Sequence, residues 1–281
     1  MEITFLSLNP EFFEGFLKEG ILKNAISKGI IKINFINIRD FTLDKHSCAD
    51  DTPYGGGSGM LLKPEPIVRA FESIELLPRR KVIMPCPDGR EFNSAEASKL
   101  SDFDQLIFIC GRYEGIDERA SEILNPEKIS VGNYVLSNGE LAALVIFNSA
   151  MRNIPGVLGN SESLKSESFS IFHDSGTAIP EQRNSKEKKT AVRSCGSLTE
   201  NSNPKIFDNG IRNCKTGNFN RGIEDCAELL EYPQYTRPDE YRGIKVPDVL
   251  REGNHKLIAE WMIRESVKKT ERKLSSGNYE F

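Results

Sequence analysis

Three glycine-containing segments mark places where a small ligand can reach the main chain. They cover residues 85–89, 111–115 and 131–139, and each follows apolar residues that we expect to form a strand. Ligands of open α/β sheets bind beyond the carboxyl ends of the strands, and glycine lets a ligand approach the backbone closely. Glycines also simply make turns, so one such loop would be weak evidence. Three in succession predict a shared pocket.

Neither common phosphate-binding pattern is present. No G-x-G-x-x-G follows the first expected strand, which argues against the usual dinucleotide site. The segment YGGGSGMLLK, residues 54–63, lacks the Gly-Lys-Ser/Thr ending of a P-loop, so nothing in it would hold a β-phosphate. We interpret it as a tightly turned loop that packs near a substrate. Asp50 and Asp51, just before it, are expected to order its start or to be plain surface charges.

Composition limits the remaining classes of function. The chain has 281 residues and a formal net charge of −4, so a basic surface that binds nucleic acid must be local. Its six cysteines are widely spaced, with no C-x-x-C pair, and we expect reduced thiols and no metal site. The first residues do not form a signal peptide, and no run approaches the ~18 apolar residues of a membrane span. We therefore expect a cytoplasmic protein with no membrane segment.

Strands and helices are expected to alternate through residues 1–159. The apolar patterns predict strands at residues 2–8, 31–41, 81–87 and 104–110. They predict helices at residues 11–29, 63–77, 94–101 and 141–154. This alternation indicates an α/β fold with a largely parallel sheet.

The composition changes after residue 159. Residues 170–225 are rich in Ser, Asn, Lys and Gly, and we interpret residues 160–228 as an interdomain linker with a polar, mobile insertion. Apolar periodicity returns at residue 229, so residues 229–281 are predicted to form a small helical domain. Its last helix, from about His255, is basic, which indicates RNA binding or an ordinary solvated helix face.

Six motifs, in order, resemble the bacterial tRNA (guanine-N1)-methyltransferases of the SPOUT class. They are DDTPYGGGSGM, CGRYEGIDER, SVGNYVLSNGEL, IPGVLG, EYPQYTRP and VPDVLREGNH. The resemblance implies a parallel sheet with a trefoil knot on its C-terminal side. It also implies a homodimer with each active site at the subunit interface. The implied reaction is methylation of N1 of the guanosine that follows the tRNA anticodon on its 3′ side.

The resemblance further assigns cofactors and contacts. The methyl donor is S-adenosylmethionine, with Mg²⁺ as an accessory ion, although the sequence has no evident cluster of metal ligands. The implied donor contacts are Pro85, Pro87, Gly111, Tyr113, Glu114, Gly115, Val131, Gly132, Asn133, Tyr134, Val135, Leu136 and Gly139. The expected tRNA contacts are Gly55, Gly56, Gly57, Gly59, Met60, Arg112, Arg119, Lys268 and Arg272.

Methylation of guanine N1 requires a base and a cation. N1 carries a proton at neutral pH, which a carboxylate within hydrogen-bond reach can remove. Negative charge then builds on O6 and calls for a cation. By the resemblance Arg152 is this cation, although the helix dipole also favours an arginine at a helix C-terminus. Glu167 matches the aspartate that serves as base in the family, and Asp225 is a second candidate.

Departures from the family pattern leave alternatives open. Glu167 has one methylene more than the expected aspartate. Asn138 stands where many relatives have glycine. Asparagine tolerates left-handed backbone angles, so the turn can be kept. The glutamate and the insertion also fit a donor- and RNA-binding protein that has lost catalysis. A SPOUT methyltransferase acting on another RNA is the other alternative, and the EYPQYTRP and GNH motifs argue against it.

Overall fold

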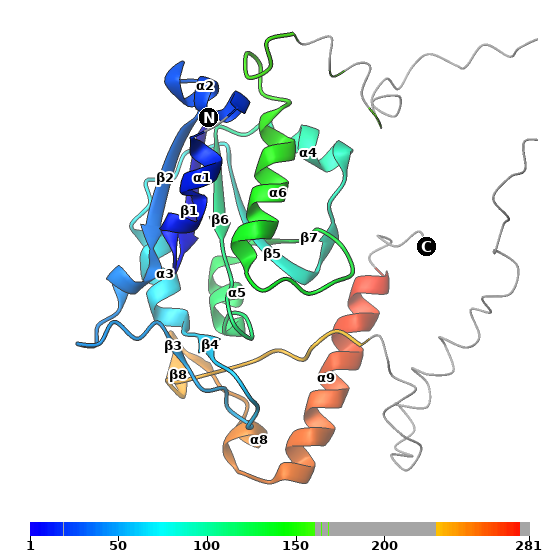
Figure 1. The fold of residues 1–281 in the computed structure, drawn as a ribbon. Coiled ribbons are helices and arrows are strands. Elements are labelled where there is room, and N and C mark those ends of the chain that lie inside the picture. The colour runs from blue at the N-terminus through cyan, green and yellow to red at the C-terminus, as the bar shows by residue number, and fades with distance from the viewer. Residues whose placement is uncertain (19, 161–163, 165–167, 169–228, 276–281) are drawn as a thin grey trace, which may run out of the picture.

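A five-stranded parallel sheet forms the centre of the molecule (Figure 1). The computed structural model describes residues 1–18, 20–160, 164, 168 and 229–275. The strand order is β2-β1-β6-β5-β7, and every neighbouring pair is parallel. The strands are β1 (Glu2–Ser7), β2 (Lys32–Asn37), β5 (Arg80–Glu91), β6 (Gln105–Ile109) and β7 (Glu127–Ser130). The predicted α/β fold with a parallel sheet is therefore confirmed.

Apolar residues on both faces of the sheet explain why its central strands are buried. Phe5 and Phe108 stack on one face, with ring centroids 5.1 Å apart. On the other face, Leu6 and Ile107 belong to a separate buried cluster. Successive strand residues point to opposite faces, and both faces of a parallel sheet are covered by helices. The Phe5 face is covered by α2 (Gly20–Ser27), α4 (Ser94–Leu100) and α6 (Gly139–Met151), and the Leu6 face by α3 (Pro64–Glu72) and α5 (Glu118–Leu124).

Several predicted elements are wrong in length. The helix predicted at 63–77 ends at Glu72, and the strand predicted at 81–87 extends to Glu91. The helix predicted at 11–29 is instead η1 (Pro10–Phe13), α1 (Glu14–Leu17) and α2. Gly20 adopts a φ of +67°, a left-handed conformation that interrupts a continuous helix. The strand predicted at 31–41 ends at Asn37, whose side chain accepts a hydrogen bond from the Arg39 N–H and starts η2 (Ile38–Phe41).

The C-terminal part forms its own apolar cluster. It contains β8 (Glu240–Tyr241), β9 (Ile244–Lys245), α8 (Asp248–Arg251) and α9 (His255–Ser275), and α9 confirms the predicted basic helix. Leu250, Ile258 and Trp261 are buried together there. The YGGGSGM loop, between β3 (Asp50–Asp51) and β4 (Leu61–Leu62), packs against this cluster. Gly55 has a φ of +84°, and a Cβ there would lie 2.8 Å from Leu250 Cδ2, so another residue would strain the backbone and displace the Leu250 side chain.

Candidate donor and RNA site

One cavity of about 750 Å³ lies at the ends of β6 and β7 and beside the irregular part of β5. Its volume is in the range of about 300–1,000 Å³ that is typical of small-molecule sites. Residues 85–88, 111–115 and 131–139 all line it, which confirms that the three glycine-containing loops share a pocket. Every residue predicted to contact the donor is among the lining residues.

Two glycines let main chains cross closely beside this cavity. A Cβ on Gly139 would lie 2.7 Å from the Gly111 nitrogen, and the Gly139 N–H donates to the Gly111 carbonyl at 2.8 Å. A Cβ on Gly89 would overlap the main chain of Ile129. Glycine is needed at both positions because another main chain lies where a Cβ would be. This requirement differs from that of a glycine in a turn.

The start of α6 corrects one expectation about Asn138. Its φ is −161°, which is extended, so no left-handed conformation is needed there. The Asn138 side chain instead caps α6 by accepting a hydrogen bond from the Leu141 N–H at 3.0 Å. Tyr113 is the non-glycine residue of these loops with a left-handed φ, +58°. Such strained backbone is often found at ligand sites.

Two carboxylates give the cavity an acidic side. Glu114 and Glu231 both line it. Burial raises the pKa of Glu231, and the negative charge of Glu114 raises this pKa further. The Gln234 side-chain N–H donates to Glu231 at 2.6 Å. This side suits a ligand that carries positive charge, because such a ligand relieves the repulsion between the two acids.

A buried carboxylate orients Arg112 at the cavity. Glu140, fully buried in the first turn of α6, accepts hydrogen bonds from the Ser7 hydroxyl at 2.5 Å and from Arg112 Nε at 3.2 Å. Arg112 is the one predicted tRNA contact that also lines the cavity. Neither Glu140 nor Ser7 was predicted as a site residue, since a contact between residues 133 apart leaves no local sequence pattern.

Most of the other predicted tRNA contacts lie beside the cavity or on the surface. The glycines of the YGGGSGM loop do not line the cavity, but Gly59 packs against the Glu114 side chain and the Met60 carbonyl accepts from the Glu114 N–H at 3.0 Å. Lys268 and Arg272 are exposed on α9. These residues therefore border the cavity or face solvent.

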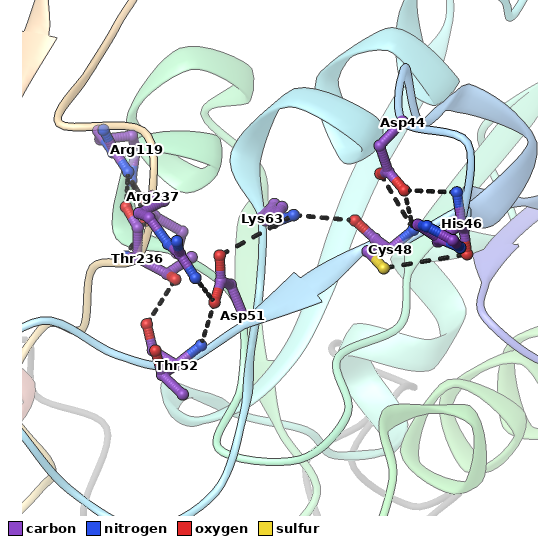
Figure 2. Close-up of polar contacts among 10 residues, drawn as sticks. Asp44, His46, Cys48, Asp51, Thr52, Lys63, Arg119, Thr236 and Arg237 are labelled. Carbon is purple, nitrogen blue, oxygen red and sulfur yellow. Dashed lines mark hydrogen bonds and ion pairs between the residues drawn. The ribbon is translucent and has the colours of Figure 1, made fainter.

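Arg119 does not contact RNA from this position, so that prediction is wrong. The side chain is fully buried, and its guanidinium donates to the carboxylate of Asp117 and to the carbonyls of Thr236 and Pro238. Figure 2 shows Arg119 beside Thr236 and the β3–β4 region. Arg119 is a structural residue that joins the start of α5 to the C-terminal segment.

Asp51 orders the start of the YGGGSGM loop, as one reading of the sequence predicted (Figure 2). Its carboxylate accepts hydrogen bonds from the Thr52 N–H at 2.8 Å and from Arg237 at 2.6 Å. The Thr236 hydroxyl donates to the Thr52 carbonyl at 2.7 Å. The loop is thus tied to the EYPQYTRP motif on its N-terminal side.

Residues 229–234 and α9 supply a second wall of the cavity, and this wall was not predicted from the sequence. This wall consists of Leu229, Leu230, Glu231, Tyr232, Gln234, Lys269, Thr270, Lys273 and Leu274. The Leu230 N–H donates to the Thr270 hydroxyl at 2.9 Å, which joins residues 229–234 to α9. The EYPQYTRP motif was the available signal, but nothing in its residue types shows which loop it contacts.

A charged cluster lies where this wall meets the first loop. Lys128 Nζ is 3.1 Å from Asp88 and 3.0 Å from Glu118, and Lys269 Nζ is 3.1 Å from the same Asp88 oxygen. Burial would raise the pKa of Asp88, but attraction to Lys269 and Lys128 outweighs it and lowers this pKa to about 2. Asp88 is therefore ionised at any physiological pH.

The residues predicted to perform the chemistry are not brought together within the described part of the chain. Arg152 follows the last turn of α6, and Gly139, which lines the cavity, begins that helix. A helix of 13 residues is about 20 Å long. Glu167 and Asp225 lie outside the described residues. Among the described residues, no group of three or more metal-ligating side chains is assembled, and no helix is long and apolar enough to span a membrane.

The chain has a parallel sheet with a cavity at the carboxyl ends of its strands, and a basic helix lies beside this cavity. These features define the chain as an α/β ligand-binding protein. Residues 1–189 and 217–276 match the family model described as tRNA (Guanine-1)-methyltransferase TrmD. The chain belongs to this family, as the motifs predicted. Residues 190–216, within the polar insertion, are outside the match.

Curated relatives carry the same description. The chain is 42% identical over 272 residues to the tRNA (guanine-N(1)-)-methyltransferase of Carboxydothermus hydrogenoformans, covering 96% of this chain and 84% of the relative. It is 42% identical over 271 residues to that of Persephonella marina, covering 96% and 85%. It is 39% identical over 274 residues to that of Gloeothece citriformis, covering 97% and 94%.

Proposed function

We propose that this chain transfers a methyl group from S-adenosylmethionine to N1 of the guanosine that follows the anticodon of tRNA on its 3′ side. The observation that carries the proposal is the convergence of all the expected donor contacts on one cavity, in a chain that belongs to the tRNA (guanine-1)-methyltransferase family. The basic face of α9 and Arg112 provide nearby positive charge for the phosphates of an RNA substrate.

The composition of the cavity fits this donor. S-adenosylmethionine has an adenine, a sulfonium and an amino-acid end. Main-chain groups of the three loops that line the cavity can hydrogen-bond a purine edge, and the side chains of Val131 and Leu136 can cover its faces. Glu114 and Glu231 face the positive charge. The bound donor supplies the methyl group, and these residues bind and orient it.

The chain's own side chains handle the proton and the developing charge. Glu167 accepts the proton of guanine N1, which leaves an electron pair on N1 to bond to the methyl carbon. The bond from this carbon to the sulfonium sulfur breaks at the same time, its electron pair stays on sulfur, and S-adenosylhomocysteine is the leaving group. Arg152 stabilises the negative charge on O6. Asp225 remains the second candidate for the base. Because a base inside the anticodon stem-loop is stacked, the target guanosine leaves its stack to reach the cavity.

The position of Arg152 supports a homodimer with shared active sites. Leu141, Val145, Asn148 and Arg152 follow one another at helical spacing along one face of α6, where Leu141 is 39% and Val145 52% exposed. Apolar side chains at such positions suit a helix that is covered by another subunit. In a twofold interface each surface meets its own copy. Antiparallel pairing of this face brings Arg152 of each chain to the cavity end of the other.

The trefoil knot is also part of the proposal. Its support is the close crossing of main chains at Gly139 with Gly111 and at Gly89 with Ile129, together with the bridge between Arg112 and Asn138. Deep threading is rare in proteins, and it requires segments that pass without side chains between them.

The proposed division of the chain follows its apolar clusters. Residues 1–159 form the donor-binding domain, residues 160–228 the linker with its insertion, and residues 229–281 the tRNA-binding domain. The cluster around Trp261 is separate from the two that cover the sheet. Lys268 and Arg272, exposed on α9, contact tRNA phosphates. Replacing both by alanine is expected to weaken tRNA binding and leave donor binding unchanged.

An accessory Mg²⁺ is kept in the proposal. Glu114 and Glu231 offer carboxylate oxygens at the cavity, and Mg²⁺ completes its six ligands with oxygens from water or substrate. Loss of methyl transfer in EDTA, with recovery on adding Mg²⁺, tests this point. Unchanged transfer in EDTA would remove the ion from the proposal.

The decisive experiment is methyl transfer from labelled S-adenosylmethionine to unmodified tRNA transcripts, with and without guanosine after the anticodon, followed by mapping of the methylated atom. Product at guanine N1 of that position supports the proposal. Donor binding without transfer to any transcript favours the alternative of a donor- and RNA-binding protein. Under single turnover, Glu167→Gln is expected to lose most of the rate and Glu167→Asp to retain it.

A further inference from the structure

The C-terminal helix is attached directly to the first donor loop. Lys269 of α9 pairs with Asp88 at 3.1 Å, and Lys273, one turn later, donates a hydrogen bond to the Pro87 carbonyl. Pro85 and Pro87 of this loop line the cavity, as do Lys269 and Lys273. A loop that shapes the cavity from the N-terminal domain is thus held by the last helix, since Pro87 and Lys273 are 186 residues apart in the chain.

Asp88 is the only carboxylate within ion-pairing distance of Lys269 among the described residues. Lys128, by contrast, has two partners, Asp88 and Glu118. Asp88 is also mostly buried, with 13% of its side chain exposed. Because water screens a buried pair less than an exposed one, the Lys269–Asp88 contact is stronger than the usual surface ion pair.

We propose that Asp88 is a positioning residue through which α9, by way of Lys269, holds the donor loop in its binding conformation, so that donor affinity depends on the docked C-terminal helix. This inference rests on the proposed function, because it takes the cavity as the donor site. Asp88 need not contact the donor. Its ion pair with Lys269 joins the loop to α9 and so fixes the main chain beside Asp88, at Pro87.

This arrangement connects the two halves of the reaction. The side of α9 that carries Lys269 and Lys273 faces the cavity, and the adjacent side carries the exposed Lys268 and Arg272. A helix contacted by RNA on one side and by the donor loop on the other couples the two ligands, since each favours the same docked helix. Donor and tRNA are therefore expected to strengthen each other's binding.

The neighbouring Lys268 provides a matched control. It is on the same helix and carries the same charge, but it is exposed and pairs with Glu265 at 2.7 Å, three residues earlier on α9. Lys268→Met removes one positive charge from α9 without touching the donor loop. A general effect of charge or helix propensity would therefore appear in both lysine variants.

The test measures binding of S-adenosylmethionine to the full chain by calorimetry, without RNA. Asp88→Asn and Lys269→Met are each expected to weaken binding about tenfold, a moderate value for coupled sites. Lys269→Arg and Lys268→Met are expected to bind like the unchanged protein. The double variant should bind no more weakly than Asp88→Asn alone, because Asp88→Asn already removes the contact with Lys269. Circular dichroism checks that each variant is folded.

Kinetics separate positioning from a general structural role. In steady-state methyl transfer, Lys269→Met is expected to raise the KM for the donor with kcat nearly unchanged once donor is saturating. A variant that was merely less stable would lose kcat in proportion to the folded fraction.

The outcomes are distinguishable. Equal donor affinities for the unchanged protein and Lys269→Met, or additive effects of Asp88→Asn and Lys269→Met, would overturn the inference while the proposed function stands. Absence of donor binding by the unchanged protein would overturn the proposed function and the inference with it.

Discussion

Arg119 and Asp117 form a fully buried ion pair that holds the main chain of the EYPQYTRP motif against α5. Arg119 donates to Asp117 at 2.8 and 2.7 Å, to the Thr236 carbonyl at 2.5 Å and to the Pro238 carbonyl at 2.7 Å. Asp117 in turn accepts from the Thr236 N–H at 2.6 Å. The pair places residues 229–234 along the cavity, so it supports the site from outside it.

Removing one member of this pair is expected to be costly. Arg119→Met leaves the Asp117 carboxylate buried and unpaired, which should lower the free energy of unfolding by about 3–5 kcal/mol. Because Trp261 packs near Tyr232 and Tyr235, release of this segment should also shift tryptophan emission to longer wavelength. Urea unfolding followed by fluorescence measures both effects, since Trp261 is the single tryptophan.

Arg79→Met is the control for the loss of an arginine. Arg79 is 64% exposed and lies 3.9 Å from Asp104, so its removal should change stability by less than about 1 kcal/mol. Equal stabilities of Arg119→Met and Arg79→Met would contradict a supporting role for the buried pair.

Four of the five strands of the sheet and the glycine-containing loops could be predicted from local sequence, because apolar runs and glycines carry that information residue by residue. The fifth strand, β7, has only four residues and was not predicted. The second wall of the cavity could not be predicted either. Arg119 and Thr236 are 117 residues apart, and Lys273 and Pro87 are 186 apart. The apolar periodicity of a sequence does not show which distant residues are in contact. Residue type alone also does not distinguish a buried arginine from one that binds RNA.

Asn138 illustrates a smaller limit of prediction. Its residue type fits a left-handed turn and a helix N-cap equally well. The choice depends on where α6 begins, which the residue type of Asn138 does not specify. In the structure α6 begins at Gly139, so Asn138 has an extended φ and caps the helix at Leu141.

The stability of the protein should depend on Asp88 in acid. Its pKa in the folded protein is about 2, against about 3.9 for an unfolded aspartate. A lowered folded pKa gives stability that is fully present above the unfolded pKa and is lost as pH falls toward the folded one. Asp88→Asn should therefore cost about 2 kcal/mol at pH 7, and its deficit should shrink between about pH 4 and pH 2.

Thermal unfolding at a series of pH values checks this dependence. Asp104→Asn is the control, because Asp104 is 53% exposed and 3.9 Å from Arg79. A deficit of Asp88→Asn that stays constant down to pH 2 would mean that its charge is not what stabilises the cluster.

Gly139→Ala should damage the donor cavity. The added Cβ would lie 2.7 Å from the Gly111 nitrogen and 3.1 Å from the Gly111 carbonyl oxygen, so the two loops must separate. Donor affinity is expected to fall by more than about tenfold, since backbone shifts of this kind cost about 1–3 kcal/mol. Isothermal calorimetry with S-adenosylmethionine measures the loss. Gly159→Ala, where a Cβ meets no atom within 4 Å, should bind the donor normally, and a similar loss there would show that the effect is not specific.

Mixed dimers test the proposed homodimer, in which Arg152 acts in the active site of the other subunit. Arg152→Ala and Gly139→Ala homodimers should each be nearly inactive, the first for want of the cation and the second for want of the donor. When the two are unfolded together and refolded, half of the dimers are mixed, and each mixed dimer has one site with an intact cavity from one chain and Arg152 from the other. About a quarter of the activity of the unchanged protein should return. If Arg152 serves the cavity of its own chain, every site in the mixture lacks one function, and no activity returns.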